Sequence, residues 1–202
     1  METRKRMTGF VVGVSALAGL TVFSLLVVAG DLEPSAPPAP TMRTLDEVEP
    51  RIPLGRTIKP GDFACLYRIT EGGSYYLARN ITTPRTCIIV EANDVVIDLR
   101  GYQLSGMGGA TFGNSCVYMN GCRNVEIRNG TIQDFGGYGV HEASPDGRGH
   151  RVIGIRVVSN AAGGISVHGD GHLVRDCTAA QNGTHGIIIH GDGSTVTQRR
   201  VI

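Results

Sequence analysis

The 202-residue sequence contains no tryptophan, and aromatic side chains make up only 5% of it. A surface that stacks sugar rings on aromatic side chains would therefore have to rely on a few tyrosines. An excess of positive charge is also missing, since 19 Lys and Arg face 18 Asp and Glu. A protein that follows a nucleic-acid backbone needs a basic stripe, so this balance argues against a nucleic-acid partner.

Glycine, in contrast, is abundant at 29 residues, and the chain contains an internal repeat. Residues 150–171 (HRVIGIRVVSNAAGGISVHGDG) are followed without a gap by residues 172–193 (HLVRDCTAAQNGTHGIIIHGDG). Nine of the 22 paired positions are identical. Self-similarity at a fixed period indicates a repeat architecture, in which each unit packs on the next.

Each repeat has the pattern of short strands joined by turns. Apolar residues alternate, as at Ile165 and Val167, and clusters of Gly, Asn and Asp that favour turns separate them. Coils stacked about 4.8 Å apart would bury the Val and Ile columns and place Asn160 over Asn182, whose amides we expect to bond along the stack. The sequence therefore predicts an all-β parallel β-helix, right-handed by the rule for parallel crossovers.

The repeat phrase VRDCTAAQNGTHGI (174–187) resembles that of bacterial right-handed parallel β-helix proteins of the pectin-lyase-like superfamily. The segments GGSYYLARNIT (72–82) and VVIDLRGYQLSG (95–106) are similar to the N-terminal start of a secreted group in that superfamily. The resemblance covers residues 69–202 and implies the same fold. It implies little about chemistry, because this scaffold supports lyases, hydrolases, epimerases and proteins without known activity.

The N-terminal part of the chain differs from the repeats. Residues 1–30 join three consecutive basic residues to a long apolar run, which predicts a secretory signal or a retained membrane anchor and hence a secreted or cell-envelope protein. Residues 31–62 are rich in proline and indicate an extended linker. We expect one folded domain over residues 63–202, with room for about five coils.

The sequence stops in the middle of a predicted coil, after Ile202. Solenoids use capping repeats to cover their last coil. We therefore expect residues 194–202 to be the least ordered part of the domain and self-association to occur through this end.

Five cysteines cannot all pair within one chain. Cys177 falls in a predicted core column, where a thiol acts as a small apolar side chain. Cys65 with Cys87 and Cys116 with Cys122 are the natural pairings of the other four, although spacing alone does not fix connectivity. Their separations do not suit structural zinc, so no metal site is predicted.

The repeat places His168 and Asp170 in register with His190 and Asp192. Such a column of two imidazoles and two carboxylates could bind a divalent ion or a uronate-containing polysaccharide. Alternatively, the Gly-Asp-Gly sequence is simply a turn, in which glycine supplies positive φ and aspartate bonds to neighbouring backbone.

A second candidate is His141 with Glu142, at the mouth of an enlarged turn over residues 144–149. Long loops on one face of a solenoid are common binding sites. The phrase from Tyr138 to Glu142 faintly resembles the Tyr-Gly…His-Glu segment of alginate epimerases, but it lacks the Asp-Pro that precedes the His-Glu pair there. An exposed His-Glu pair is also ordinary surface chemistry.

A third candidate is Asp98 with Arg100, because lyases of the superfamily combine calcium-binding acids with an arginine base. Alternation along IDLRG places both side chains on the outer face, where they can pair with each other. An exposed pair contributes only about 0–1 kcal/mol. The nearby sequence lacks the cluster of three acids that a calcium-dependent lyase would need.

Two hypotheses follow. The first is an exported β-helix that binds or displays polysaccharide or another envelope component, without a cofactor. The second is a polysaccharide lyase or C5-epimerase that acts on uronate glycans through His141, Glu142 and the His168/His190 column, with calcium if it is a lyase. The few aromatic residues and the missing acid cluster favour the first hypothesis, whereas the enlarged turn favours the second.

Overall fold

The computed structural model describes residues 51–55, 62–108 and 113–197, all of which belong to one compact unit over Arg43–Ile202. This part of the chain contains strands and turns only, and no helix that could span a membrane. The signal or anchor predicted for residues 1–30, and most of the predicted linker, lie outside the described residues.

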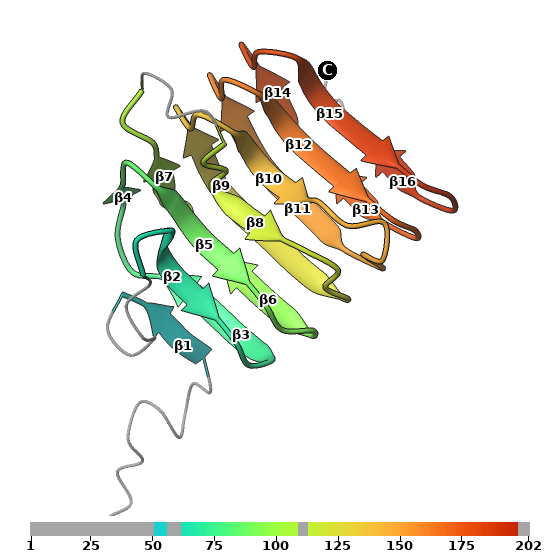
Figure 1. The fold of residues 1–202 in the computed structure, drawn as a ribbon, viewed down its shortest axis with the longest axis horizontal. Helices are drawn as coiled ribbons and strands as arrows, with labels where there is room; N and C mark the ends of the chain where they lie inside the picture. Colours follow the sequence, from blue (N-terminus) through green and yellow to red (C-terminus); the bar gives the residue numbers. More distant parts are fainter. Residues whose placement is uncertain (1–50, 56–61, 109–112, 198–202) are drawn as a thin grey trace, which may run out of the picture. The chain divides into compact units, whose positions relative to one another are not determined.

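The strands form two parallel sheets that wind around a shared core (Figure 1). The six-stranded sheet contains β2 (Cys65–Ile69), β5 (Thr86–Val90), β8 (Val117–Met119), β10 (Tyr138–Glu142), β12 (Gly163–His168) and β15 (His185–His190). The path of the ten-stranded sheet contains β1 (Arg51–Leu54), β3 (Gly73–Leu77), β6 (Val95–Asp98), β9 (Val125–Gln133), β11 (Arg151–Val158), β13 (Leu173–Arg175) and β16 (Thr195–Thr197). Beside this path lie β4 (Ile81–Thr82), β7 (Gln103–Ser105) and β14 (Thr178–Ala180).

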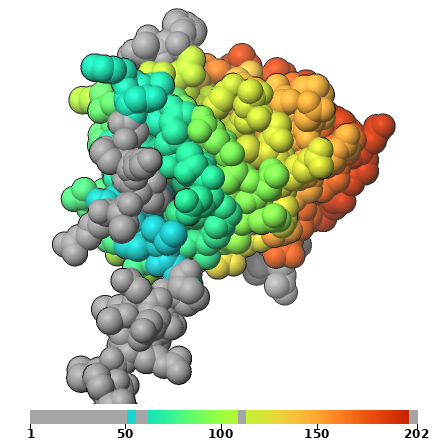
Figure 2. Space-filling view, turned by 60° about the horizontal axis from the view of Figure 1, so that its bottom comes forward, coloured from blue at the N-terminus to red at the C-terminus, as the bar shows by residue number. Residues whose placement is uncertain are grey.

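The prediction of a parallel β-solenoid is confirmed. All pairings among the described strands are parallel and join successive coils, and the coils follow one another in sequence order across the molecule (Figure 2). Each strand of the six-stranded sheet comes from a separate coil, so the described residues form six coils rather than the expected five or so.

The register follows the repeat length. Ile165 pairs with Ile187, 22 residues later, whereas Val140 pairs with Ile165, 25 residues later. The three extra residues lie in the enlarged turn that follows β10. Val140 and Ile165 are fully buried, so the aliphatic columns lie inside as expected.

The asparagine ladder is also confirmed. The backbone N–H of Asn160 donates to Oδ1 of Asn182 at 3.0 Å, and Nδ2 of Asn160 donates to the same oxygen at 3.1 Å. One coil earlier, the N–H of Phe135 donates to Oδ1 of Asn160 at 3.1 Å. Each amide therefore satisfies a backbone N–H that the turn leaves without a strand partner.

The N-terminal boundary differs from the prediction. Four residues of the expected linker, Arg51–Leu54, form β1, which pairs with β3 so that Arg51 lies opposite Ser74. The Leu54 side chain is buried. Prolines do not prevent this pairing because β1 lies at the edge of its sheet, where a missing N–H is tolerated.

The suggested disulfides are not present, because all five cysteines are free and buried. The register explains the difference: Cys65 lies opposite Thr86, which leaves Cys87 next to Cys116 in the following coil. The N–H of Cys87 donates to the carbonyl oxygen of Cys116 at 3.1 Å. Cys177 lies in the core, as predicted.

The last described strand, β16, is exposed along its whole length, and Val196 keeps 58% of its surface. It pairs with β13, so residues 195–197 still belong to the solenoid. The remainder of the segment expected to be least ordered, residues 198–202, lies outside the described residues.

Candidate functional site

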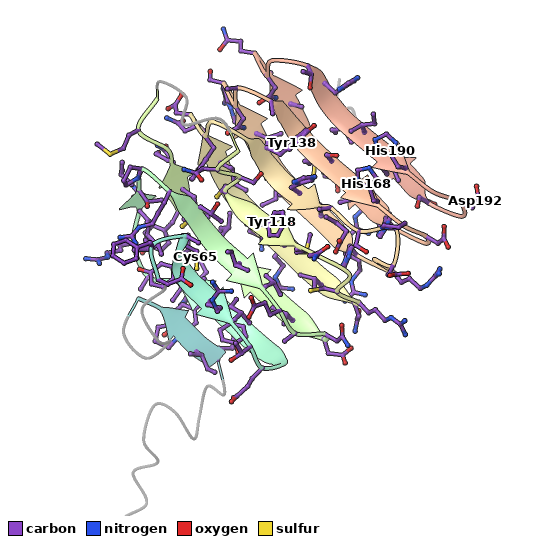
Figure 3. The ribbon with its side chains drawn as sticks, viewed as in Figure 1. Cys65, Tyr118, Tyr138, His168, His190 and Asp192 are labelled. Atoms are coloured by element: carbon purple, nitrogen blue, oxygen red, sulfur yellow. The ribbon has the colours of Figure 1, made fainter. Side chains whose placement is uncertain are left out.

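The outward face of the six-stranded sheet carries a set of neighbouring rings, here named the ring row: Tyr118, Tyr138, His141, His168 and His190. Figure 3 labels Tyr118, Tyr138, His168 and His190 on this face. The ring centroids of Tyr118 and His141 lie 5.7 Å apart, and those of Tyr138 and His141 4.6 Å apart. His141 lies 6.4 Å from His168, which lies 4.2 Å from His190. The row therefore crosses the four successive coils that contain β8, β10, β12 and β15.

Alternation along the strands places these rings outside. In β10, Val140 and Glu142 are fully buried while His141, between them, is only half-buried. Register then brings rings from neighbouring coils together, because His141 pairs with Tyr118 and His168 pairs with His190. The sequence predicted the His168/His190 column but missed the two tyrosines.

Glycines at two positions explain how Tyr138 joins the row. Gly139 and Val140 both face the core, since a Cβ at Gly139 would lie 2.9 Å from a core valine side chain. Tyr138 and His141 on either side of them therefore both point outward. In the next coil, a Cβ at Gly163 would lie 2.9 Å from the Tyr138 ring, so glycine leaves the space that the ring occupies.

His168 stacks on His190, and a hydrogen bond to the backbone fixes the tautomer of the His168 ring. The planes differ by only 12°. Nδ1 of His168 lies 2.9 Å from the carbonyl oxygen of Glu142, which can only accept, so Nδ1 carries the hydrogen. In the neutral ring, Nε2 of His168 is therefore left as an acceptor.

His141 lies in the middle of the row, between rings from three coils. Burial lowers the pKa of its imidazole below the ordinary value, and the neighbouring His168 lowers this pKa further. His141 is therefore neutral at pH 7, with a flat face and polar ring nitrogens.

Glu142 is not the exposed partner of His141 that the sequence suggested. Its side chain faces the core in register with Met119 and Val167, and none of its surface is exposed. The two neighbours therefore lie on opposite faces of the sheet, because successive side chains alternate along a strand. Glu142 cannot contact a ligand bound on the ring row.

The buried carboxylate of Glu142 is fully bonded. Oε1 accepts from the backbone N–H groups of Gly121 and Ser144, both at 2.8 Å, and Oε2 lies 3.2 Å from Nε2 of His150. Burial would raise the pKa of Glu142, but the bonds from His150, Gly121 and Ser144 outweigh it and hold the pKa below its ordinary value. The carboxylate therefore ties three segments outside the strands, at Gly121, Ser144 and His150, to the buried face of β10.

A second histidine column, His150 and His172, was missed in the sequence. Their rings stack inside the turns at 4.9 Å and 9°. Nδ1 of His150 accepts from the N–H of Val125, and Nδ1 of His172 accepts from the N–H of His150, so both rings carry their hydrogen on Nε2. The sequence signal that could have predicted this column is that histidine occupies the first position of both 22-residue repeats.

The structure places Asp170 in the turn after β12, with both carboxylate oxygens bonded. Oδ1 accepts from the N–H of Asp192 at 3.0 Å, and Oδ2 pairs with Arg148. These bonds lower the pKa of Asp170, that from Asp192 most. Asp192 is exposed at the tip of the next turn (Figure 3). The geometry favours the turn interpretation of Gly-Asp-Gly over a ligand column.

Asp98 and Arg100 do not form the pair suggested by alternation. Asp98 is buried and accepts from the backbone N–H of Arg100 at 2.9 Å and from Nε of Arg128 at 3.1 Å. The guanidinium of Arg100 lies 4.7 Å from the centre of the Tyr76 ring instead. The reason is that Arg100 has φ of 51°, which ends the strand and breaks the alternation.

Among the described residues, no group of three or more His, Cys, Asp or Glu side chains could hold a metal ion. Comparisons with protein-family models, with curated proteins and with solved structures find no match to this chain.

Proposed function

We propose that this protein binds a polysaccharide chain along the ring row and acts as a binding or surface-display module rather than an enzyme. The observation that carries the proposal is the row itself: five rings in contact across four consecutive coils, on one outward face.

The rings suit a sugar chemically. Tyrosine and histidine present a flat apolar face and a polar tip, so one side chain can pack against sugar C–H groups and bond to a hydroxyl. Nε2 of His168 is available as an acceptor, since Nδ1 is held by the backbone of Glu142. Tyr118 and Tyr138 are each only partly buried.

A polymer suits the row better than a small molecule. Coils repeat about every 4.8 Å along the solenoid, so equivalent positions recur at a constant interval. A regular chain that lies parallel to the solenoid axis can contact the rings of β8, β10, β12 and β15 in turn. Two of the eleven tyrosines and phenylalanines, Tyr118 and Tyr138, lie on this row beside the three histidines.

Binding is favoured over turnover by the position of Glu142. A lyase or epimerase needs an acid or base beside the reacting carbon and a group that neutralises the substrate carboxylate. The Glu142 carboxylate cannot take part, because it is buried with its oxygens bonded to Gly121, Ser144 and His150, which leaves only the imidazoles and phenols of the row for this chemistry. The resemblance of the repeats to the pectin-lyase-like superfamily supports a role in glycan recognition, and residues 1–30 support export to the cell envelope.

The proposal is tested by measuring retention of the full chain in gels that contain alginate, pectate or a neutral glucan. Tyr138→Ala and His141→Ala should each weaken binding roughly two- to tenfold, because a ring contact contributes about 0.5–1.5 kcal/mol. Tyr102→Ala is the matched control, since Tyr102 is 36% exposed in the turn between β6 and β7.

Equal affinities of the row variants and the control would contradict the proposal. The same mixtures, with and without calcium, are followed by ultraviolet absorbance for an unsaturated product and by NMR for inversion at C5. Turnover that disappears in His141→Ala or His168→Ala would replace the binding module with an enzyme.

A further inference from the structure

Three of the five rings in the row can carry a positive charge. His141, His168 and His190 are neighbours in space, at centroid distances of 6.4 and 4.2 Å. Histidine is the side chain whose ordinary pKa, about 6.5, lies closest to physiological pH. Protonation of these neighbouring rings would make the row positive.

The groups that face the three imidazoles from neighbouring strands are not acidic. They are Tyr118 from β8 and Ser166 from β12, which pair with His141, then Tyr138 from β10, and Ile188 from β15, which pairs with Ser166. The one carboxylate nearby among the described residues is that of Glu142, in β10 itself, which raises the pKa of His141 by less than burial and His168 lower it.

The other carboxylates near the six-stranded sheet are buried on its inner face, paired with arginines, or located in turns beyond the row. Glu142 is buried beneath the sheet, Asp170 pairs with Arg148, and Glu91 and Asp62 pair with Arg68. Asp146 and Asp192 are exposed in the turns that follow β10 and β15.

Charged imidazoles at these distances repel one another, which opposes the uptake of several protons by the row on its own. Burial lowers the pKa of His141, and repulsion from the neighbouring His168 lowers it further. An anion on the row would offset the repulsion and favour the protonated rings. At His168 the added proton must go to Nε2, because Nδ1 already donates to Glu142, and this creates a new donor at the far end of the ring.

We propose that the ligand of the ring row is an anionic polysaccharide and that its binding is coupled to protonation of His141, His168 and His190, so that affinity rises as the pH falls. This inference rests on the proposed function and specifies the charge and the regulation of the same site. For each proton taken up on binding, affinity increases by up to about tenfold per pH unit.

The test uses the full chain and calorimetric titration with alginate, dextran sulfate and neutral dextran between about pH 7.5 and pH 5.5. Carboxylates and sulfates both remain ionised over this range, since an ordinary carboxyl pKa is about 4. We expect the affinity for both anionic polymers to rise about tenfold or more as the pH falls, and proton uptake to appear as a dependence of the heat on the buffer. Dextran should show no such trend.

Two variants separate the effect of the imidazole charge from the effect of the flat ring. His190 is exposed and stacks on His168, so His190→Phe keeps a flat ring and should reduce the pH dependence. His190→Arg makes the charge permanent and should raise affinity at pH 7.5 while flattening the profile. Arg156→Gln, which removes a charge from the ten-stranded sheet, is the control and should change neither.

Binding of anionic glycans with the same affinity at every pH, or binding of dextran alone, would overturn the coupling and leave the polysaccharide module intact. Loss of all glycan binding would overturn both. Duplex DNA bound with the same pH profile would show that the row accepts polyanions in general and would overturn the assignment to a glycan. A far-ultraviolet circular dichroism spectrum that stays constant from pH 7.5 to 5.5 establishes that the variants remain folded.

Discussion

The buried carboxylate of Glu142 gives the sharpest prediction for this fold. Glu142→Gln keeps the shape of the side chain and an oxygen for the N–H groups of Gly121 and Ser144. The new amide nitrogen would face Nε2–H of His150, so two donors would meet. His150 cannot change tautomer to relieve this contact, because its Nδ1 already accepts from the N–H of Val125.

The expected loss follows from these contacts. Glu142→Gln removes one charge-assisted hydrogen bond and should lower the free energy of unfolding by about 1.5–3 kcal/mol. Glu142→Ala leaves three donors without an acceptor in a buried site and should lower it by about 3–5 kcal/mol. His141→Gln, one residue earlier on the outer face, is the control and should change it by about 0.5 kcal/mol or less.

The measurement is urea denaturation at pH 7, followed by circular dichroism, with the same transition slope required for all variants. His150→Asn completes the experiment, since an asparagine oxygen can still accept from Val125 while the contact to Glu142 disappears. In that background Glu142→Gln should be at least about 1 kcal/mol less damaging. A Glu142→Gln variant as stable as His141→Gln would refute this account of the interior.

The pH dependence of the same variants has a definite sign. Because the folded pKa of Glu142 lies below its ordinary value of 4.5, its contribution is present above about pH 4.5 and is lost as the pH falls through the folded pKa. Stability of the wild type should therefore fall steeply below pH 4.5, and that of Glu142→Gln should fall less. Parallel profiles would contradict the pairing of this carboxylate in the folded state.

Three further predictions concern the stack. Ile165→Asp should prevent folding because Ile165 is fully buried, and Ile187→Asp should be less damaging because Ile187 is half-buried. Ile188→Asp, on the outer face, should be the least damaging of the three. Resistance to proteolysis would rank the variants, and equal effects would mean that the assigned register is wrong. Asn160→Ala should lower the free energy of unfolding by about 1–3 kcal/mol, because it removes the acceptor for the buried backbone N–H of Phe135. Urea denaturation measures this loss, and an unchanged free energy would show that the ladder does not contribute to stability. Burial, and then a neighbouring imidazole, lowers the folded pKa of His172 below its ordinary value of 6.5, so stability should begin to fall below pH 6.5 and should fall less in His172→Asn.

The repeat alone determined the fold. Two copies of one 22-residue pattern can bury their apolar columns only by stacking, so the parallel solenoid, the pairing of Ile165 with Ile187 and the ladder from Asn160 to Asn182 follow from spacing. The same argument placed His168 beside His190. Residues at equivalent positions in consecutive coils must be neighbours, whatever the chemistry of their side chains.

Tertiary structure decided the features that depend on how coils of unequal length meet. The sequence predicted an exposed Glu142, whereas the structure buries it on the opposite face of β10 from His141, and its bonding partners come from turns that spacing does not locate. Cys87 meets Cys116 because the early coils differ in length, which shifts the register away from a fixed period. Tyr138 joins the ring row only because Gly139 turns inward and Gly163 leaves room for the ring in the next coil. The repeat length in the sequence determines which coils stack on each other. The backbone conformation of the turns between strands, which depends on local packing, determines which side chains come into contact.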